Sequence, residues 1–175
     1  MGDKKRKKKV PEPAKQRGRI PHQDSLSLDK VCFHFQYENW MKAYSDKKFT
    51  NFLKDSEMYA EYITKIFSFL IPKITHEWSP QNNSYRGFRH CHQISDGRAY
   101  DKYKKAIKSL HNVEIDQLEL WQFGINGSYR LICEFSGGII YPLLIDYHHL
   151  GYDNKHHNQD DYKQYDFCPV SKYIK

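Results

Sequence analysis

One arginine and two adjacent histidines stand at the two ends of a β-rich segment, and their side chains have the chemistry of an RNA-cleaving site. Arg130 lies in an alternating run that ends at Phe135, and His148 and His149 close the apolar run that starts at Ile139. A guanidinium group can bind a phosphate through two parallel hydrogen bonds. An imidazole titrates near neutral pH, so it can take a proton from a ribose hydroxyl or return one to a leaving group. The sequence therefore predicts Arg130 as the phosphate-binding residue and His148 or His149 as general acid or base.

The same residues also have structural interpretations, and the sequence leaves both open. A strand arginine often pairs with a carboxylate across the sheet, and Glu119 or Glu134 is available for such a pair. Adjacent strand residues point to opposite faces, so only one of the two histidines is expected to share a face with Arg130. The structural alternative for the histidine pair is one core side chain and one exposed side chain.

A second pair of histidines, His90 and His92, is separated by a single residue. On a strand this spacing places both imidazoles on one side and Cys91 on the other. We predict that His90 and His92 complete the catalytic site and that the neighbouring Arg89 contacts RNA. A transition-metal site is an alternative use of the pair, although its other ligands would have to come from distant segments. An ordinary hydrogen-bonded strand edge is the structural alternative.

Two tyrosines close to the paired histidines, Tyr147 and Tyr152, are predicted to contact RNA. Aromatic rings stack on the unpaired bases of single-stranded RNA, which gives these residues a reason to lie beside a cleavage site. Packing in the protein core is the alternative use of both rings, because the chain contains 14 tyrosines.

The excess positive charge belongs to the N-terminal tail and not to the rest of the chain. Residues 1–19 hold nine Lys and Arg against two acidic residues, whereas residues 20–175 hold 19 basic and 19 acidic residues. Net charge is therefore no argument that the domain itself binds nucleic acid. Residues 1–28 are predicted to be disordered. Their basic cluster is expected to attract RNA, with a targeting signal or a solubilising tail as alternatives, and consists of Lys4, Lys5, Arg6, Lys7, Lys8 and Lys9.

The elements expected around these residues form one α+β domain over residues 29–175. Apolar residues at three- and four-residue spacing predict a helix that starts with Ser56 as N-cap and that Pro72 ends or kinks. A second amphipathic helix is expected from about 98 to 111. Strands are expected at 31–37, 118–123, 128–135 and 139–149. This order favours helices packed on one face of a small, mainly antiparallel sheet.

The remaining composition predicts a cytoplasmic protein. The four cysteines are scattered and form no Cys-x-x-Cys pair, and no apolar segment follows the basic N-terminus to make an export signal. Reduced thiols are therefore expected. The chain has no run of 18 apolar residues, so no membrane span is predicted.

The segment from Leu118 to His149 resembles the C-terminal sheet of the RelE/ParE-type toxin superfamily. The residues that carry the resemblance are Gly127-Ser-Tyr-Arg130-Leu-Ile, which match the arginine strand, and a final apolar strand that closes in Asp146-Tyr-His-His149. The resemblance implies an endoribonuclease that cuts mRNA, often on the ribosome, and is neutralised by a small antitoxin. It also implies that Arg130 stabilises the phosphorane and that no metal or other cofactor is needed.

We therefore expect a toxin-type endoribonuclease that cleaves RNA by metal-independent acid–base chemistry. Its expected partners are mRNA, including mRNA on the ribosome, and a cognate antitoxin protein. One alternative is a non-catalytic protein-interaction or inhibitor module linked to phage or defence. Another is a metal-dependent nuclease that uses His90 and His92 as ligands.

Overall fold

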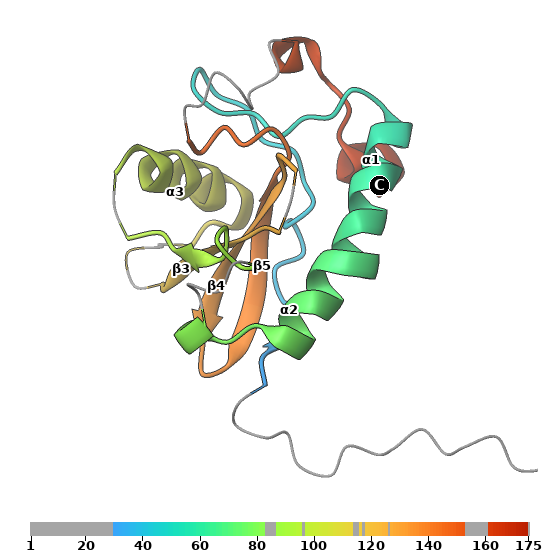
Figure 1. Ribbon diagram of the computed structural model, residues 1–175. Helices are drawn as coiled ribbons and strands as arrows, with labels where there is room; N and C mark the ends of the chain where they lie inside the picture. Colours follow the sequence, from blue (N-terminus) through green and yellow to red (C-terminus); the bar gives the residue numbers. More distant parts are fainter. Residues whose placement is uncertain are drawn as a thin grey trace, which may run out of the picture.

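A five-stranded sheet forms the centre of the molecule, with the strand order β1-β5-β4-β3-β2 (Figure 1). The computed structural model describes residues 30–82, 87–95, 97–113, 116, 118–125, 127–152 and 161–174. Its strands are β1 (Cys32–Phe33), β2 (His92–Gln93), β3 (Leu120–Phe123), β4 (Arg130–Ser136) and β5 (Ile139–Asp146). β1 pairs with β5 in parallel, and the other three pairings are antiparallel. The predicted α+β class is confirmed, and the predicted tail lies outside the described residues.

Helices cover both faces of this sheet (Figure 1). One face carries a continuous helical rod made of α1 (Ser56–Lys65), the π-helical η1 (Ile66–Leu70) and α2 (Ile71–Glu77), and the other face carries α3 (Arg98–His111). The short elements are η2 (Pro80–Asn82), η4 (Tyr162–Gln164) and α4 (Pro169–Tyr173). The sequence predicted helices on one face only. Both faces are covered because β4 is apolar on both sides, with Leu131 packed toward α1 and α2 and Ile132 toward α3.

The helical rod begins and continues differently from the prediction. Its N-cap is Asp55, whose carboxylate accepts a hydrogen bond from the Met58 amide at 2.8 Å, and Ser56 is the first helical residue. Pro72 does not end the rod but lies at the start of α2, directly after the π-helical turn. In that turn the Ile71 amide donates to the Ile66 carbonyl five residues back. The wider turn suits a proline, which has no N–H to donate and whose ring crowds the preceding turn.

The β4–β5 hairpin has the predicted glycine turn and an irregularity that was not predicted. Gly137 and Gly138 have φ values of 58° and 81°, the backbone of a tight two-residue hairpin turn. Farther along β5, Pro142 pairs with Cys133 and Leu144 pairs with Ile132, so the residue between them is an extra one. This is a β-bulge, and it occurs where a proline cannot donate to the ladder.

The bulge reverses the facing of every later residue in β5. Leu143 and Leu144 both pack in the α3 core, and Ile145 packs in the core under α1 and α2. Asp146, the last strand residue, then lies opposite Arg130 in the register. The strand ends there and not at His149, so the chain turns immediately after the bulged strand.

No helix in the described residues combines the length and the apolar character that crossing a membrane requires.

Candidate functional site

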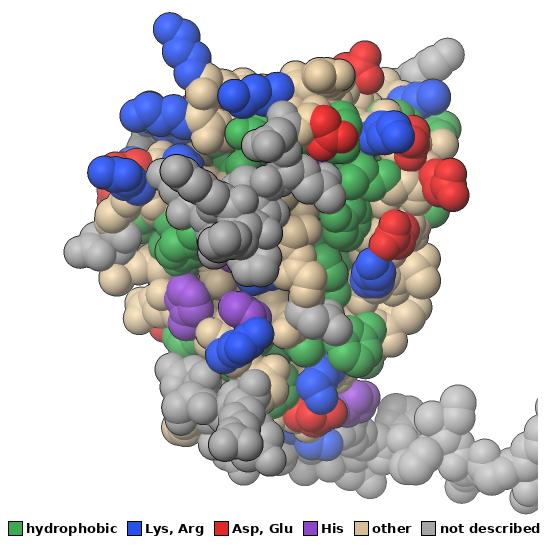
Figure 2. All heavy atoms as spheres, turned by 45° about the horizontal axis from the view of Figure 1, so that its top comes forward, with side chains coloured by type: hydrophobic (Ala, Val, Ile, Leu, Met, Phe, Trp, Pro, Cys, Tyr) green, Lys and Arg blue, Asp and Glu red, His purple; other side chains and the backbone are tan. Residues whose placement is uncertain are grey.

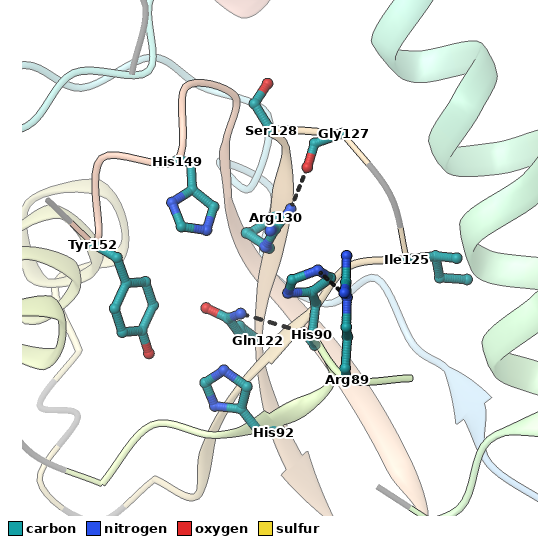
Figure 3. Close-up of a pocket in the computed structure, with 10 residues that line it drawn as sticks. All are labelled: Arg89, His90, His92, Gln122, Ile125, Gly127, Ser128, Arg130, His149 and Tyr152. Atoms are coloured by element: carbon teal, nitrogen blue, oxygen red, sulfur yellow. Dashed lines mark hydrogen bonds between the residues drawn. The ribbon is translucent and has the colours of Figure 1, made fainter. Parts of the chain in front are cut away.

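A pocket of about 540 Å³ lies where β4 begins, next to β2, β3 and the turn that follows β5. Figure 3 shows its side chains arranged in a ring around the pocket. Its lining residues are Arg89, His90, His92, Gln122, Ile125, Gly127, Ser128, Arg130, His149 and Tyr152. Among the described residues that line it there are two guanidinium groups and three imidazoles, and none is acidic. This composition makes the pocket attractive to an anion.

Arg130 lies at the back of the pocket and is only 3% exposed. Its Nη1 donates to the Gly127 carbonyl at 2.8 Å and to the Tyr129 carbonyl at 2.7 Å, so the guanidinium is held by its own turn. Burial lowers the pKa of Arg130 from its ordinary value, and Asp146 acts in the opposite direction. The guanidinium still remains charged, because arginine does not lose its proton in proteins.

The expected alternative for Arg130, a salt bridge to Glu119 or Glu134, is not formed. Glu119 accepts a hydrogen bond from the indole of Trp121 at 2.9 Å, and Glu134 accepts one from the hydroxyl of Tyr37 at 2.9 Å. Neutral carbonyl groups therefore hold Arg130 at the pocket. Its positive charge is not paired with the carboxylate of Glu119 or of Glu134.

Gly124 provides the space that the Arg130 side chain occupies. A Cβ atom at this position would lie 2.7 Å from Cδ of Arg130 and 3.1 Å from its Nε. Those distances are shorter than non-bonded carbon and nitrogen atoms tolerate. The absence of a side chain at position 124 thus lets the guanidinium lie flat against the end of β3.

The two adjacent histidines do separate, although they lie in the turn after β5 and not on a strand as predicted. His149 lines the pocket with Arg130 and has a φ of 58°, a left-handed backbone conformation. His148 lies outside the pocket, is 2% exposed and has its Nε2 2.7 Å from the Phe52 carbonyl. Its ring stacks on Tyr162 at 5.7 Å between centroids. The prediction that either histidine could serve is therefore narrowed to His149, because His148 is part of the packing between two distant segments.

Asp146 holds the turn that presents His149. Its buried carboxylate accepts the hydroxyl of Tyr103 at 2.9 Å and the backbone amides of His148, Leu150 and Gly151 at 3.2, 3.0 and 2.8 Å. Four donors compensate a carboxylate that is 0% exposed. Burial, followed by the charge and the hydrogen bond of Asp146, raises the pKa of Tyr103 well above its ordinary value, so this hydroxyl stays a donor. The carboxylate therefore fixes the pocket wall through backbone groups.

His90 and His92 face the same pocket, and Cys91 faces the opposite core, as the spacing predicted. The pKa of His90 is lowered to about 4 by burial and by the positive charges of Arg130 and Arg89. Its Nε2 lies 3.0 Å from Nε of Arg89, which donates to it. His90 is consequently neutral at physiological pH.

The ring of His92 has its Nδ1 3.1 Å from the Gln93 carbonyl. A carbonyl oxygen can only accept, so this contact assigns a proton to Nδ1, and in the neutral form of the ring the lone pair is then on Nε2. Tyr152 lies between two imidazoles, with ring centroids 6.2 Å from His92 and 5.7 Å from His149. The three rings form one wall of the pocket (Figure 3).

One predicted site residue lies outside the pocket, and two polar lining residues were missed. Tyr147 is 1% exposed and packs against Tyr62 in the core, so it is not available to stack on a base, which corrects the prediction. Gln122 was missed, although it interrupts the apolar run of β3 with a polar side chain. Its Nε2 donates to the His90 carbonyl at 3.3 Å, and its buried Oε1 has no hydrogen-bond partner among the described residues. Ser128 was also missed, and its hydroxyl donates to the Tyr147 carbonyl at 3.1 Å.

The remaining predictions about the site concern the tail and the metal alternative. The basic cluster of the tail, Lys4, Lys5, Arg6, Lys7, Lys8 and Lys9, lies outside the described residues. Within the described part of the chain, no three His, Cys, Asp or Glu side chains are grouped so that they could hold a metal ion. The pair of His90 and His92 thus gains no third ligand there.

Similarity to known proteins decides the family. A family model described as "Uncharacterised protein UU032" matches residues 36–175. The chain belongs to the UU032 family. A relative from Ureaplasma parvum serovar 3, described as "Uncharacterized protein UU032", is 36% identical over 155 residues, which is 86% of this chain and 86% of the relative. No solved structure matches the chain.

Membership of the UU032 family overturns the resemblance to RelE/ParE-type toxins. The family match extends over most of the chain, whereas the resemblance rested on the Leu118–His149 segment alone. The shared features were an arginine at a strand start and a histidine pair after an apolar strand, and an ordinary hairpin can contain both. The antitoxin and the ribosome were implied by that resemblance, so they lose their support with it. The geometry of the pocket in this UU032 family member does not depend on that resemblance, because it rests on the positions of the side chains.

Proposed function

We propose that the pocket binds a phosphodiester of RNA and cleaves it by acid–base chemistry in which the protein's own side chains move the protons. The observation that carries the proposal is the ring of two guanidinium groups and three imidazoles, with no acidic residue among the described lining. Such a ring attracts the phosphate and offers imidazole groups that can accept or donate a proton. RNA is the substrate class because its 2′-hydroxyl supplies the nucleophile within the chain.

The arrangement supports separate roles for His92 and His149. Figure 3 shows these two side chains apart from each other, with Gln122 between them and Arg130 beside His149. Neutral His92, whose Nδ1–H is held by the Gln93 carbonyl, takes the proton of the 2′-hydroxyl at Nε2. The 2′-oxygen then forms a bond to phosphorus and the bond from phosphorus to the 5′-oxygen breaks. Protonated His149 gives its proton to that leaving oxygen, so the products are a 2′,3′-cyclic phosphate and a 5′-hydroxyl.

The two arginines and His90 bind the reacting phosphate in this proposal. Arg130 is anchored through Nη1, which supports a fixed position for the rest of its guanidinium. Arg89 is exposed and donates to His90, so it can turn toward an arriving phosphate without breaking a core contact. His90, with a pKa of about 4, is a neutral hydrogen-bonding group and not the acid.

We place this activity in the cytoplasm, where RNA is the abundant phosphodiester. The four cysteines, all in described positions, are free thiols, which agrees with a reducing compartment.

Cleavage of a labelled RNA oligonucleotide in EDTA tests the proposal. We expect a 2′,3′-cyclic phosphate product and no cleavage of the 2′-O-methyl analogue, which lacks the nucleophile. His92→Ala and His149→Ala should each slow cleavage by about 100-fold or more, as loss of a general acid or base does. His76→Ala is the matched control, because His76 is exposed on α2 and does not line the pocket. RNA left intact by the wild-type protein, or cleavage undiminished in Arg130→Ala and His149→Ala, would refute the proposal.

A further inference from the structure

A second hollow of about 790 Å³ runs along the exposed side of α3, and we call it the basic groove. Its acidic residues are Asp46 and Asp101, and they are outnumbered by basic ones. The basic residues that line it are Lys48, Arg98, Lys102, Lys104, Lys105 and Lys108. This concentration of charge contrasts with the balanced composition of residues 20–175 as a whole. The basic groove is therefore a local feature that net charge does not reveal.

Helical spacing aligns four of these cations. Arg98, Lys102, Lys105 and Lys108 follow one another at intervals of four, three and three residues, so they share one face of α3. Neighbouring positions on such a stripe are about 5–6 Å apart, and the stripe is about 15 Å long. Figure 2 shows Lys and Arg side chains gathered on the side of the molecule where α3 lies, on the same face as a group of histidine side chains.

The basic groove adjoins the pocket at the N-terminal half of α3. Nζ of Lys102 donates to the Leu150 carbonyl at 2.6 Å, and Leu150 directly follows His149 of the pocket. Tyr152 lines the pocket and packs against the hydrophobic core under α3. The basic groove and the pocket are thus linked through the hydrogen bond from Lys102 to Leu150.

We propose that the basic groove binds the phosphate backbone of single-stranded RNA that continues beyond the scissile bond. The choice of RNA rests on the proposed function, whereas the groove itself is a separate binding site. The proximity of the proposed phosphate pocket favours a polyanion that can contact both hollows at once. A single strand is favoured over a duplex, because a nucleotide in the pocket must expose both its sugar and its phosphate to the side chains that line it. The consequence is that long RNA binds more tightly than a dinucleotide does.

Binding of uncleavable 2′-O-methyl RNA to the full-length protein tests the groove without requiring catalysis. The probes are oligomers of about 4 and about 16 nucleotides, a range that single-strand sites cover. The variant is the pair Lys105→Ala and Lys108→Ala, which lie on the stripe beyond Lys102. The matched control is the pair Lys54→Ala and Lys163→Ala, two exposed lysines outside the groove that change the net charge equally.

We expect the groove variant, but not the control, to bind the long oligomer at least tenfold more weakly and the short one as the wild type does. Its salt dependence should fall by about 1.4 in slope, since each phosphate contact of a single strand contributes about 0.7. Equal binding of the long oligomer by the groove variant and the control would overturn the inference. Polyglutamate that competes as well as the long RNA would overturn it too, in favour of an acidic protein. Cleavage of a dinucleotide is measured in parallel, so that failure of the pocket and failure of the groove are distinguished.

Discussion

The hydroxyl of Tyr103 is a buried side-chain contact through which α3 holds the turn that carries His149. Tyr103→Phe removes this one oxygen and keeps the ring, which is 0% exposed and lies edge-on to Phe49 at 5.8 Å between centroids. The hydroxyl donates to Oδ2 of Asp146, which also accepts the Gly151 amide. The substitution therefore leaves a buried carboxylate with one donor fewer.

The cost follows from the charge and burial of the acceptor. A hydrogen bond to a charged group contributes about 1.5–3 kcal/mol to stability, and water cannot easily replace the lost donor at this buried oxygen. We expect the free energy of unfolding to fall by about 2 kcal/mol. With a urea slope of about 2 kcal/mol/M, the unfolding midpoint should fall by about 1 M.

Urea titration followed by tyrosine and tryptophan fluorescence measures this change. Tyr44→Phe is the matched control, because its hydroxyl also donates to a carboxylate, Asp46 at 3.2 Å, but does so at the surface. We expect the control to lose less than about 0.5 kcal/mol. Equal midpoints for the two variants would show that the carboxylate of Asp146 does not depend on α3, and the account of how His149 is held would be wrong.

Three further predictions concern the pocket and the hairpin. Gly124→Ala should displace the guanidinium of Arg130, since the new Cβ would lie 2.7 Å from Cδ, and should weaken sulfate binding about tenfold by calorimetry while circular dichroism remains unchanged. Bound sulfate, whose charge is constant over the titration, should raise the pKa of His90 from about 4 because it offsets the arginine charges. Sulfate affinity should accordingly rise as the pH falls, and proton NMR of the imidazole detects both effects; an unmoved pKa would place the anion elsewhere. Gly138→Ala should lower stability by about 1 kcal/mol in a thermal melt, because its φ of 81° strains any residue with a side chain.

The elements predicted well are those whose signals are local. The helix from Arg98 to His111 has the bounds that its spacing predicted, and the two glycines of the β4–β5 turn adopt the left-handed backbone that such a turn requires. The first strand was predicted over seven residues, but only Cys32 and Phe33 pair with β5, so alternation alone does not set the length of a strand.

The placement of helices on both faces could not be predicted from alternation in one strand. Ile132 is apolar and lies two residues after Arg130, so alternation places both side chains on one face. The two residues do share a face, but α3 covers Ile132 and leaves Arg130 at the pocket. A pattern of apolar residues predicts which side chains must be buried. Which helix buries them depends on how the chain connects the helices to the sheet.

The candidate site was partly predictable. Residue types and spacing predicted Arg130, His149 and the His90–His92 pair as site residues. The structure places all of them in one pocket. The choice between the adjacent histidines depends on the bulge at Pro142 and on the turn held by Asp146. Both are non-local, because they follow from pairing with β4 and from a contact with α3.

The π-helical turn of the long rod has a consequence for the evolution of the family. The buried residues of the rod, Tyr62, Ile66, Leu70 and Ile74, repeat every four residues. A uniform α-helix advances by about 40° over each such step, so these side chains would spiral away from the sheet. The wider turn of Ile66–Leu70 takes up the surplus rotation and keeps one stripe facing the core. A family member that lost a single residue within this turn would rotate everything after it by about 100°, so length here is constrained more strongly than composition.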